Sequence, residues 1–471
     1  MNEETLDFIR QHADDDVRQL ALQGARAKAV DLPYALNQIA GRQQARQKLP
    51  SWAAIEGLTY PPHISMEQCS SEKTARYKAA VAERLLGDDQ RACMADLTGG
   101  FGVDFSFLAS TFRKAVYVEQ QPHLCEAARH NFQLLGLTQA EVVQGDGVSY
   151  LRQMEPVDLL YIDPARRDSH GQRTFGIADC TPNILEIADE MAEKSHYCII
   201  KLSPMLDWHQ AVAELENDKR GGHKKHITEV HIISSNNECK ELLLVLSRQD
   251  SPKKSLYCVN DEQQFVLDIS QTAVSLLCKA APVFIGDSLE LRTERLFQDD
   301  NGELRTDRLF QDDNGELRTE RYDYSQGSGS SSKGNHTSQF STLSSQLVLS
   351  PLNYYLFEPN ASIMKAGCFD AVAERFGVRQ VGNNSHLFVA TQDVAEFPGR
   401  RFQIERVTSM NKRELKTALS GIEKANIAVR NFPLSVAELR KRLRLKDGGD
   451  HYLFATTVAD RNHVLMVCRK V

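Results

Sequence analysis

The stretch MADLTGGFGVD, from Met94 to Asp104, is a short apolar run that ends in an acid and continues into a glycine-rich turn. Glycine allows a tight turn and lets a ligand approach the backbone closely. Two nucleotide-binding motifs do not fit, because Phe105 takes the third glycine position of G-x-G-x-x-G and no G-K-[ST] follows. What remains is an acid at the end of a predicted strand, followed by spaced glycines. This pattern is typical of a turn that binds a ligand. The alternative is a turn that binds no ligand and serves only the packing of the fold.

Apolar runs alternate with helix-like segments from Cys93 to about Leu246. CMADL, AVYVE, AEVVQGD, VDLLYIDP and YCIIKLSP are separated by helical stretches, whereas EVHIIS and ELLLVLS lie close together, joined by SNNECK. Strands that alternate with helices predict a doubly wound, mainly parallel sheet. We therefore expect an α/β fold with a seven-stranded Rossmann-like sheet and an antiparallel hairpin at one edge.

Acids stand at the ends of successive predicted strands. Glu119 ends the second strand, where an acid can accept hydrogen bonds from both hydroxyl groups of a ribose. Asp146 follows the third strand and Asp163 ends the fourth. Each acid alone has an alternative interpretation as a solvated residue. Their order on successive strands, after the glycine turn, predicts a bound nucleotide-like cofactor.

The glycine turn resembles motif I of class I S-adenosylmethionine (SAM)-dependent methyltransferases. The resemblance implies that SAM is the cofactor and that Asp146 contacts its adenine amino group. The residues expected to hold SAM are Asp96, Thr98, Gly99, Gly100, Gly102, Glu119 and Asp146. Ser71 and Thr74, in the segment SMEQCSSEKTARYK, are candidates for holding the methionine end of SAM, with helix capping as the alternative.

The tip of the fourth strand reads Asp163-Pro164-Ala165-Arg166 and lies where doubly wound sheets place their sites. It resembles the [DN]-P-P-[YFW] motif of methyltransferases that act on exocyclic base amines, but alanine replaces the second proline and arginine replaces the aromatic residue. We predict that Asp163 and Pro164 shape the methyl-transfer pocket. Arg166 is expected to contact a base or a phosphate, with an ion pair of Arg166 and Arg167 that closes the loop as the alternative.

Methyltransferases that act on carbon five of uridine often read D-P-P-R at this place, which is closer to this sequence. They also need a cysteine nucleophile, commonly just beyond strand five. Here that position reads Ser203-Pro204. Cys198 lies within the predicted strand, as a core residue, and Cys180 is the other nearby candidate. We therefore expect direct methyl transfer from SAM to nitrogen.

Composition divides the chain into several parts, since 471 residues exceed the size of a single core. The copies RTERLFQDDNGEL, from Arg292, and RTDRLFQDDNGEL, from Arg305, form a short tandem repeat that we interpret as a surface loop, with a partner-binding arm as the alternative. The expected parts are an N-terminal helical domain at 1–87, the cofactor domain at 88–250, a connecting segment at 251–291, the repeat with a Gly/Ser-rich linker at 292–345, a small α+β unit at 346–396 and a basic domain at 397–471.

The C-terminal domain is basic, with 16 Lys and Arg against 7 Asp and Glu between Phe397 and Val471, in a chain of net charge −7. A basic module on an acidic chain favours a polyanionic partner, nucleic acid first. The alternative is a set of solvated basic helix faces. The expected binding residues are Arg430, Arg440, Arg442, Arg444 and Lys446.

Segments along nearly the whole chain, among them DLTGGFGVD, YIDPARRD, NNECKELLLV, YLFEPNASIMKAG and KANIAVRNFPLSVAELRKRLRLKDGGDHYLFATT, resemble a bacterial family of class I methyltransferases. Its members carry a ferredoxin-like unit, here at 346–396, and a C-terminal THUMP-like domain, here at 397–471. The resemblance implies RNA binding. The resulting hypothesis is a SAM-dependent methyltransferase for a base of tRNA or rRNA. The alternatives are a protein or small-molecule substrate, and a non-catalytic RNA-binding protein with a vestigial SAM site.

Other features of the sequence bear on the environment of the protein. Ten cysteines occur without the spacing of a zinc site, and they are expected to be reduced thiols. We find no signal peptide and no apolar stretch of membrane-spanning length. A cytoplasmic protein without a metal or a membrane partner is therefore expected. The sequence does not indicate an oligomeric state.

Overall fold

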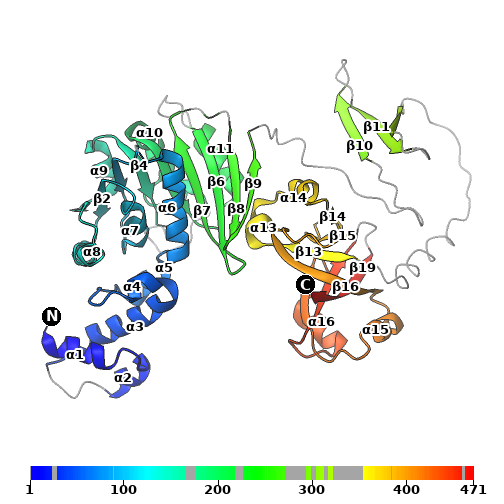
Figure 1. Ribbon diagram of the computed structural model, residues 1–471, viewed down its shortest axis with the longest axis horizontal. Coiled ribbons are helices and arrows are strands. Elements are labelled where there is room, and N and C mark those ends of the chain that lie inside the picture. The colour runs from blue at the N-terminus through cyan, green and yellow to red at the C-terminus, as the bar shows by residue number, and fades with distance from the viewer. Residues whose placement is uncertain are drawn as a thin grey trace, which may run out of the picture. The chain divides into compact units, whose positions relative to one another are not determined.

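The computed structural model divides the chain into two compact units, Met1–Gln271 and Thr272–Val471 (Figure 1). The first unit contains a set of helices and a large mixed sheet, and the second contains two smaller sheets. The residues that the structure describes are 2–23, 29–88, 90–165, 176–217, 226–249, 251, 253–270, 293–298, 304–311, 317–321, 354–382, 384–458 and 462–471.

Helices form the N-terminal part of the first unit. Their bounds are α1 Glu3–Gln11, α2 Val17–Gln23, α3 Leu32–Lys48, α4 Pro50–Ala53, α5 His63–Gln68 and α6 Glu72–Leu86. Side-chain oxygens of Asn2, Asp31 and Ser71 cap α1, α3 and α6, each accepting a backbone N–H that has no partner within its helix. Trp52 of α4 packs edge-on against Phe101 of the glycine turn, with ring centroids 5.1 Å apart. Helices α3 to α6 therefore share an apolar cluster with the turn.

A nine-stranded sheet forms the body of the first unit, in the order β3-β2-β1-β4-β5-β7-β6-β8-β9. The strands β1 to β5 are parallel, and β7 runs antiparallel between β5 and β6. The bounds are β1 Cys93–Asp96, β2 Lys114–Glu119, β3 Ala140–Gln144, β4 Val157–Ile162, β5 Ser195–Leu202, β6 His226–Ser235, β7 Glu238–Ser247, β8 Ser255–Asn260 and β9 Gln263–Asp268.

Helices cover both faces of this sheet (Figure 1). Those that connect the strands are α7 Val103–Ala109, α8 Pro122–Leu134, α9 Gly147–Gln153, α10 Ile184–Lys194 and α11 Trp208–Asn217. On one face, Phe105 of α7 and Phe132 of α8 join a core cluster that includes Ile199 of β5. The neighbouring Cys198 points to the other face, where its sulfur lies 3.8 Å from that of Met191 in α10. Burial on both faces explains why the central strands are almost continuously apolar.

The α/β fold class is confirmed, but the sheet is larger than predicted. The hairpin of β6 and β7 does not end the sheet, because β8 pairs in parallel with β6 and β9 pairs antiparallel with β8. Residues 255–268 therefore belong to the sheet, and not to a connecting segment that starts at 251. Pairing with β8 covers the outer backbone edge of β6, which would otherwise offer unpaired N–H and C=O groups.

The 13-residue repeat forms an antiparallel sheet of its own, made of β10 Thr293–Gln298, β11 Leu304–Gln311 and β12 Leu317–Arg321. The described residues of the repeat thus form paired strands, which the expectation of a loop did not include. Each copy supplies the same strand-forming segment, followed by Asn-Gly, a strong signal for a hairpin turn. The Gly/Ser-rich linker lies outside the described residues.

A seven-stranded sheet forms the rest of the second unit, in the order β14-β15-β13-β16-β19-β18-β17. Because β13 pairs with β16, the predicted α+β unit and the predicted basic domain share this sheet. The elements are β13 Tyr355–Pro359, α13 Ala361–Ala366, α14 Phe369–Phe376, β14 Arg379–Gln380, β15 Phe388–Ala390, β16 Gly399–Ser409, α15 Lys412–Ala418, β17 Asn426–Arg430, α16 Val436–Leu443, β18 His451–Thr457 and β19 His463–Lys470. Among the described residues of both units, no helix is long and apolar enough to cross a membrane.

Candidate active site

The direction of winding reverses between β1 and β4, which are neighbours in the sheet although β2 and β3 follow β1 in the sequence. Ligands of doubly wound sheets bind at such a switch point, outside the carboxyl ends of the strands. The glycine turn after β1 meets the tip of β4 there, since the backbone N–H of Asp163 donates to Oγ1 of Thr98 at 2.6 Å. Two stretches that are distant in sequence thus form one site.

The glycines of the turn are required by its conformation and its packing. Gly100 and Gly102 have φ angles of +56° and +82°, a region that side chains other than glycine rarely adopt. Gly99 has an ordinary φ, but a Cβ at this position would lie 2.2 Å from the ring of Tyr117. The N–H of Gly102 donates to the carbonyl of Gly99 at 2.9 Å, which closes the turn. The predicted turn therefore presents a tightly bent backbone at the switch point.

Asp96, at the end of β1, is buried below this turn. Its Oδ1 accepts the backbone N–H of Thr98 at 2.9 Å. Burial, together with the nearby negative charges of Asp104 and Asp163, raises the pKa of this carboxyl to about 8, although the hydrogen bond from Thr98 lowers it. Asp96 is therefore mainly protonated at neutral pH and can donate as well as accept a hydrogen bond.

The acids after β2 and β3 are both held in place by hydrogen bonds. Glu119 accepts the N–H of Gly100 on Oε2 at 2.9 Å and the N–H of Gln121 on Oε1 at 2.8 Å. Asp146 caps α9, accepting the N–H of Ser149 at 2.8 Å, and this bond holds the pKa of its carboxyl below the usual range. The two carboxylates thus have fixed orientations at the carboxyl edge of adjacent strands.

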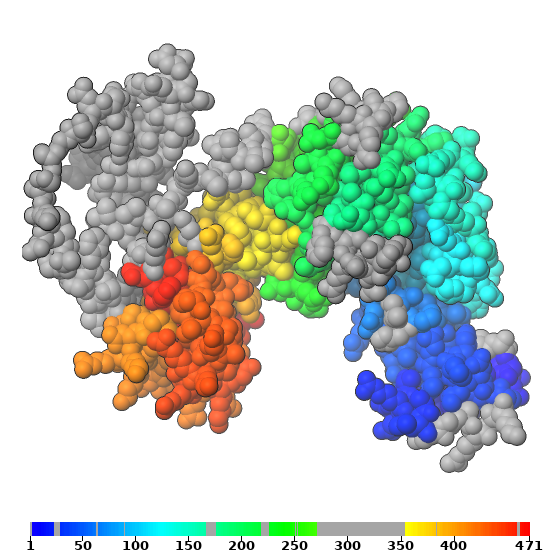
Figure 2. Space-filling model, turned by 180° about the vertical axis from the view of Figure 1, so that it is seen from behind, coloured from blue at the N-terminus to red at the C-terminus, as the bar shows by residue number. Residues whose placement is uncertain are grey.

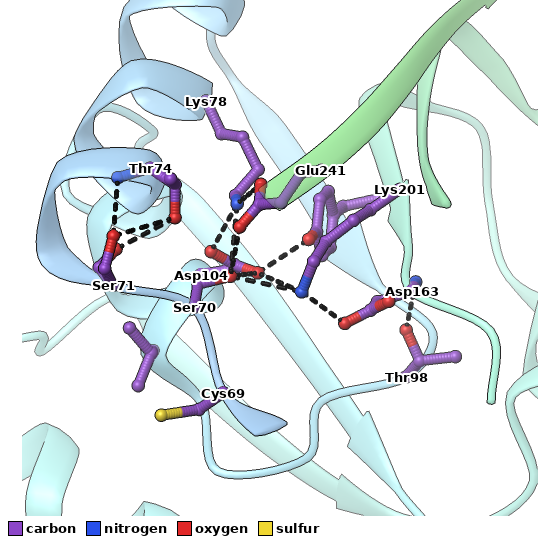
Figure 3. A network of polar contacts seen from close by, with 12 residues as sticks. Cys69, Ser70, Ser71, Thr74, Lys78, Thr98, Asp104, Asp163, Lys201 and Glu241 are labelled. Carbon is purple, nitrogen blue, oxygen red and sulfur yellow. Dashed lines mark hydrogen bonds and ion pairs between the residues drawn. The ribbon is translucent and has the colours of Figure 1, made fainter. Parts of the chain in front are cut away.

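Behind Asp163 lies a buried network of charged side chains that no motif had indicated (Figure 3). Lys201 of β5 donates from Nζ to Oδ2 of Asp163 at 2.6 Å and to Oγ of Ser70 at 3.1 Å, and it lies 3.4 Å from Oδ2 of Asp104. Lys78 of α6 lies 3.1 Å from Oδ1 of Asp104, donates to Ser70 at 3.1 Å and pairs with Glu241 of β7. We call these residues, Ser70, Lys78, Asp104, Asp163, Lys201 and Glu241, the lysine–carboxylate network.

The charges of this network stabilise each other. Burial alone would raise the pKa of the Asp104 carboxyl, but the ammonium groups of Lys78 and Lys201, with hydrogen bonds from Ser70 and Tyr161, hold it well below its usual range. Glu241 is held below its usual pKa in the same way by the two lysines. A buried charge without a partner costs several kcal/mol, so these groups can be buried only together.

Sequence patterns did not indicate the buried network that Lys78, Lys201, Glu241 and Ser70 form behind the site. The signal was a lysine within the apolar run YCIIKLSP, where a lysine is unusual unless it has a buried partner. Ser70, rather than Ser71, is the serine of the N-terminal segment that reaches the site.

The structure places two other predicted site residues in the cap of α6. Oγ of Ser71 accepts the backbone N–H of Thr74 at 3.3 Å, and the hydroxyl of Thr74 donates back to the carbonyl of Ser71 at 3.1 Å. The helix-capping alternative therefore accounts for both side chains. Pro164 is buried next to Asp163. Arg166, with its neighbour 167, lies outside the described residues.

Two cysteines near the site are buried. Cys198 lies within β5, and burial raises the pKa of its thiol strongly. Cys180 is also buried, next to Thr181, whose backbone N–H donates to the carbonyl of Ala165 at 3.1 Å. A nucleophilic cysteine needs a thiolate with a lowered pKa, and the environment of Cys198 has the opposite effect. Within the described residues, no group of three metal-ligating side chains occurs.

The five basic residues expected to bind nucleic acid fall into two groups. Arg430 donates to Oε1 of the buried Glu358 at 2.7 Å, and Arg440 donates to Asp447 at 2.5 Å, so both have roles within the fold. The more exposed group is Arg442, Arg444 and Lys446, at the end of α16 and just after it. Figure 2 shows the surface of this C-terminal region in orange to red.

Comparisons with known proteins support this description of the chain. A ferredoxin-like domain model matches residues 355–398, and a THUMP domain-like model matches residues 399–470. A provisionally assigned methyltransferase from Porphyromonas gingivalis W83 has a similar structure, with 27% sequence identity, a TM-score of 0.72, and coverage of 100% of this chain and 99% of that chain. No curated protein matches the sequence.

Two further solved structures match part of the chain. A SAM-dependent methyltransferase from Agrobacterium tumefaciens has 16% identity over 39% of this chain and 64% of that chain, with a TM-score of 0.29. A provisionally assigned RNA methyltransferase from Pyrococcus horikoshii has 16% identity over 44% of this chain and 98% of that chain, with a TM-score of 0.30. At these TM-scores neither structure carries an argument about this chain.

The sheet order and the similarity over the whole chain define a class I methyltransferase fold. The two domain models add the particular arrangement, a ferredoxin-like domain followed by a C-terminal THUMP-like domain. The resemblance predicted from the sequence, to class I SAM-dependent methyltransferases with these two domains, is thereby confirmed.

Proposed function

We propose that the protein is a SAM-dependent methyltransferase that modifies a base of structured RNA, such as tRNA or rRNA. The observation that carries this proposal is the placement of Glu119, Asp146 and Asp163 at the ends of β2, β3 and β4, on both sides of the glycine turn after β1. Ligands of doubly wound sheets bind at this position.

The chemistry of the side chains at the switch point fits SAM. The carboxylates of Glu119 and Asp146 are suited to the hydroxyl groups of a ribose and to the amino group of adenine. Bound SAM supplies an activated methyl group on a positively charged sulfur. On this proposal the turn residues Asp96, Thr98, Gly99, Gly100 and Gly102 also hold SAM. Ser71 and Thr74 remain secondary candidates for holding the methionine end of SAM.

Asp163 and Pro164 shape the position of the acceptor in this proposal. A carboxylate at the tip of β4 can accept hydrogen bonds from an exocyclic amine, and this fixes the direction of the nitrogen lone pair. Correct positioning of two reacting groups can supply a large part of a rate enhancement. The burial of Cys198, with its raised thiol pKa, supports direct transfer to nitrogen over a covalent cysteine mechanism. Arg166 is proposed to contact the substrate base or a phosphate.

An RNA substrate is supported by the second unit. The THUMP domain-like match covers residues 399–470, and this part of the chain is strongly basic. Exposed Arg and Lys side chains neutralise phosphates and give an affinity that depends steeply on salt. The exposed residues Arg442, Arg444 and Lys446 are proposed to take part in this contact.

The test uses the full chain, SAM with a labelled methyl group, and total RNA from cells that lack the gene. We expect label in RNA and one methylated nucleoside after digestion, with the methyl group on a base nitrogen. Asp163→Asn should retain SAM binding and lose at least about 100-fold in kcat, since the amide keeps one acceptor oxygen but loses the negative charge and the second acceptor oxygen. Asp88→Asn, which changes an exposed acid, is the matched control.

The possible outcomes separate the alternatives. Label on uridine carbon five would contradict the nitrogen chemistry but retain the RNA substrate. Label in protein or in a small molecule, with none in RNA, would contradict the proposed substrate. SAM binding without transfer to any of these acceptors would indicate a non-catalytic protein.

A further inference from the structure

The ammonium group of Lys201 is buried directly behind Asp163, which is unusual for a lysine in an apolar strand. We propose that Lys201 is a positioning residue for methyl transfer, which holds one oxygen of the Asp163 carboxylate so that the other oxygen remains directed to the acceptor. This inference rests on the proposed function. It assigns a role in the reaction to a residue that makes no contact with the substrate itself.

The contacts of Lys201 define a single orientation. An ammonium group has three N–H donors, and the three acceptors near Nζ are Oδ2 of Asp163 at 2.6 Å, Oγ of Ser70 at 3.1 Å and Oδ2 of Asp104 at 3.4 Å. The side chain of Lys201 is only 4% exposed. Figure 3 shows Lys201 extending from β5 to Asp163, with Ser70 and Asp104 on its other side.

Asp163 is thereby fixed at two points. Its backbone N–H donates to Oγ1 of Thr98, which places the residue against the glycine turn. Its Oδ2 accepts from Lys201, which sets the rotation of the carboxylate. Among the described residues that contact its side chain, Lys201 is the charged partner. Asp163 is also the most exposed carboxylate of the network, at 34% against 10% for Asp104 and 6% for Glu241.

The charges of the network suit this role. Two ammonium groups, of Lys78 and Lys201, face the carboxylates of Asp104, Glu241 and Asp163, so one negative charge is in excess when all five are ionised. Burial lowers the pKa of Lys201, but the carboxylates of Asp163 and Asp104 outweigh this and raise it, so the lysine stays protonated. The excess negative charge is available where the network reaches the surface, at Asp163.

Neighbouring groups complete the surroundings of Lys201 and Asp163. Asp96, at the end of β1, has a protonated carboxyl that lies near Asp163. Tyr161, on β4, donates from its hydroxyl to Oδ2 of Asp104 at 2.7 Å. Both are buried. Neither of these two groups adds a positive charge, so Lys201 supplies the cation that contacts Asp163.

Lys78 provides the comparison that separates positioning from folding. It is equally buried, at 0% exposure, and it contacts Asp104, Glu241 and Ser70 in the same network. No contact joins Lys78 to Asp163 within the described residues. A lysine with a purely structural role should therefore behave like Lys78, whereas a positioning residue should not.

The experiment compares two double variants that each remove one positive and one negative charge. Lys201→Met with Asp104→Asn removes the cation behind Asp163, and Lys78→Met with Glu241→Gln removes a pair that does not touch it. Because each pair keeps the charge balance and approximate side-chain volumes, both proteins should fold. We expect SAM affinity within about threefold of the wild type in both. The kcat for RNA should fall at least tenfold in the first variant, with KM nearly unchanged, and less than threefold in the second.

A second measurement uses Asp163→Asn as the background. If Lys201 acts through Asp163, adding Lys201→Met to Asp163→Asn should change kcat by less than twofold, because the carboxylate to be positioned is already absent. In the wild-type protein, Lys201→Met alone should lower kcat at least tenfold. Thermal unfolding of all variants, with Tm as the readout, reports the structural contribution separately.

The outcomes distinguish this inference from the proposed function. Equal losses of kcat in both double variants, or a full additional loss in the Asp163→Asn background, would overturn the positioning role. Wild-type turnover in the Lys201→Met and Asp104→Asn variant would overturn it as well. A wild-type protein that transfers no methyl group to RNA would contradict the proposed function, and the inference with it.

Discussion

Asp96 and Asp104 show how residues of one type acquire opposite properties in this fold. Both carboxyl groups are buried, and they are eight positions apart in the sequence. Asp104 contacts the ammonium groups of Lys78 and Lys201, which hold its pKa low. Asp96 has hydrogen bonds from Thr98 but no contact with a cation among the described residues, so burial raises its pKa to about 8. The nearest positive charge therefore decides the protonation state.

The raised pKa of Asp96 predicts a dependence of stability on pH. Between about pH 4 and pH 8 the carboxyl is protonated in the folded chain and ionised in the unfolded chain, so the unfolded state binds fewer protons. The contribution of protonated Asp96 to the free energy of unfolding is complete below about pH 4 and is lost as the pH rises through about 8. The loss is up to about 1.4 kcal/mol per pH unit.

The measurement is the free energy of unfolding in urea at pH 5, 6, 7 and 8. Asp96→Asn cannot ionise, so the stability of the variant relative to the wild type should increase steadily across this range. For Asp88→Asn, at an exposed position, the free energy of unfolding should change with pH in parallel with that of the wild type. If Asp96→Asn also runs parallel, Asp96 is not the group responsible.

At the scale of elements, glycines determine how closely the strand ends and helices approach each other. Gly147 begins α9, and a Cβ at this position would lie 2.2 Å from the carbonyl oxygen of Leu97 in the turn after β1. A backbone oxygen cannot move aside as a flexible side chain can. Gly145, in the same loop, has open space around its Cβ position.

Gly147→Ala is therefore expected to destabilise the protein by about 1–3 kcal/mol, because α9 must move away from the β1 turn. Gly145→Ala is the matched control and should change stability by less than about 0.5 kcal/mol. Urea unfolding of both variants measures the difference. Equal effects at the two positions would show that the close contact with Leu97 is relieved without cost.

At the scale of the whole molecule, the switch point of the large sheet and the basic C-terminal region belong to different units of the chain. The switch point lies in the first unit, within residues 1–271, and the THUMP domain-like region lies in the second. Each unit contains its own sheet and its own apolar clusters. SAM binding and RNA binding are thus expected to respond to mutation independently.

Replacing Arg442, Arg444 and Lys446 together by glutamine should weaken RNA binding and leave SAM affinity unchanged. Each phosphate contact that is lost should reduce the slope of log K against log salt by about 0.7–0.9, so three contacts would reduce it by about 2–3. The measurement is RNA affinity at several salt concentrations. Lys114→Gln with Lys240→Gln, two exposed lysines of the first unit, is the control, and an equal effect there would contradict a specific basic surface.

Local patterns allowed much of the fold to be predicted. The alternation of apolar strands and helices predicted the α/β sheet, and the glycine spacing with Asp96, Glu119 and Asp163 predicted the turn and the acids at the strand ends. Each of these signals lies within a single short segment, and the segments are identified by helix and strand periodicity. The strands β8 and β9 were missed because they form a hairpin without an intervening helix, and β9, which is mostly exposed, has a weak apolar pattern.

What the sequence alone determined, therefore, is the order of the elements and the class of the site. Only the tertiary structure showed which side chains are partners. Lys78 meets Glu241 across 163 residues, Lys201 meets Asp104 across 97, and Arg430 meets Glu358 across 72. A lysine or arginine in a sequence is normally a solvated residue, and only a buried carboxylate brought close by the fold gives it another role. The physical reason is that the stability of a buried charge depends on its neighbours in space.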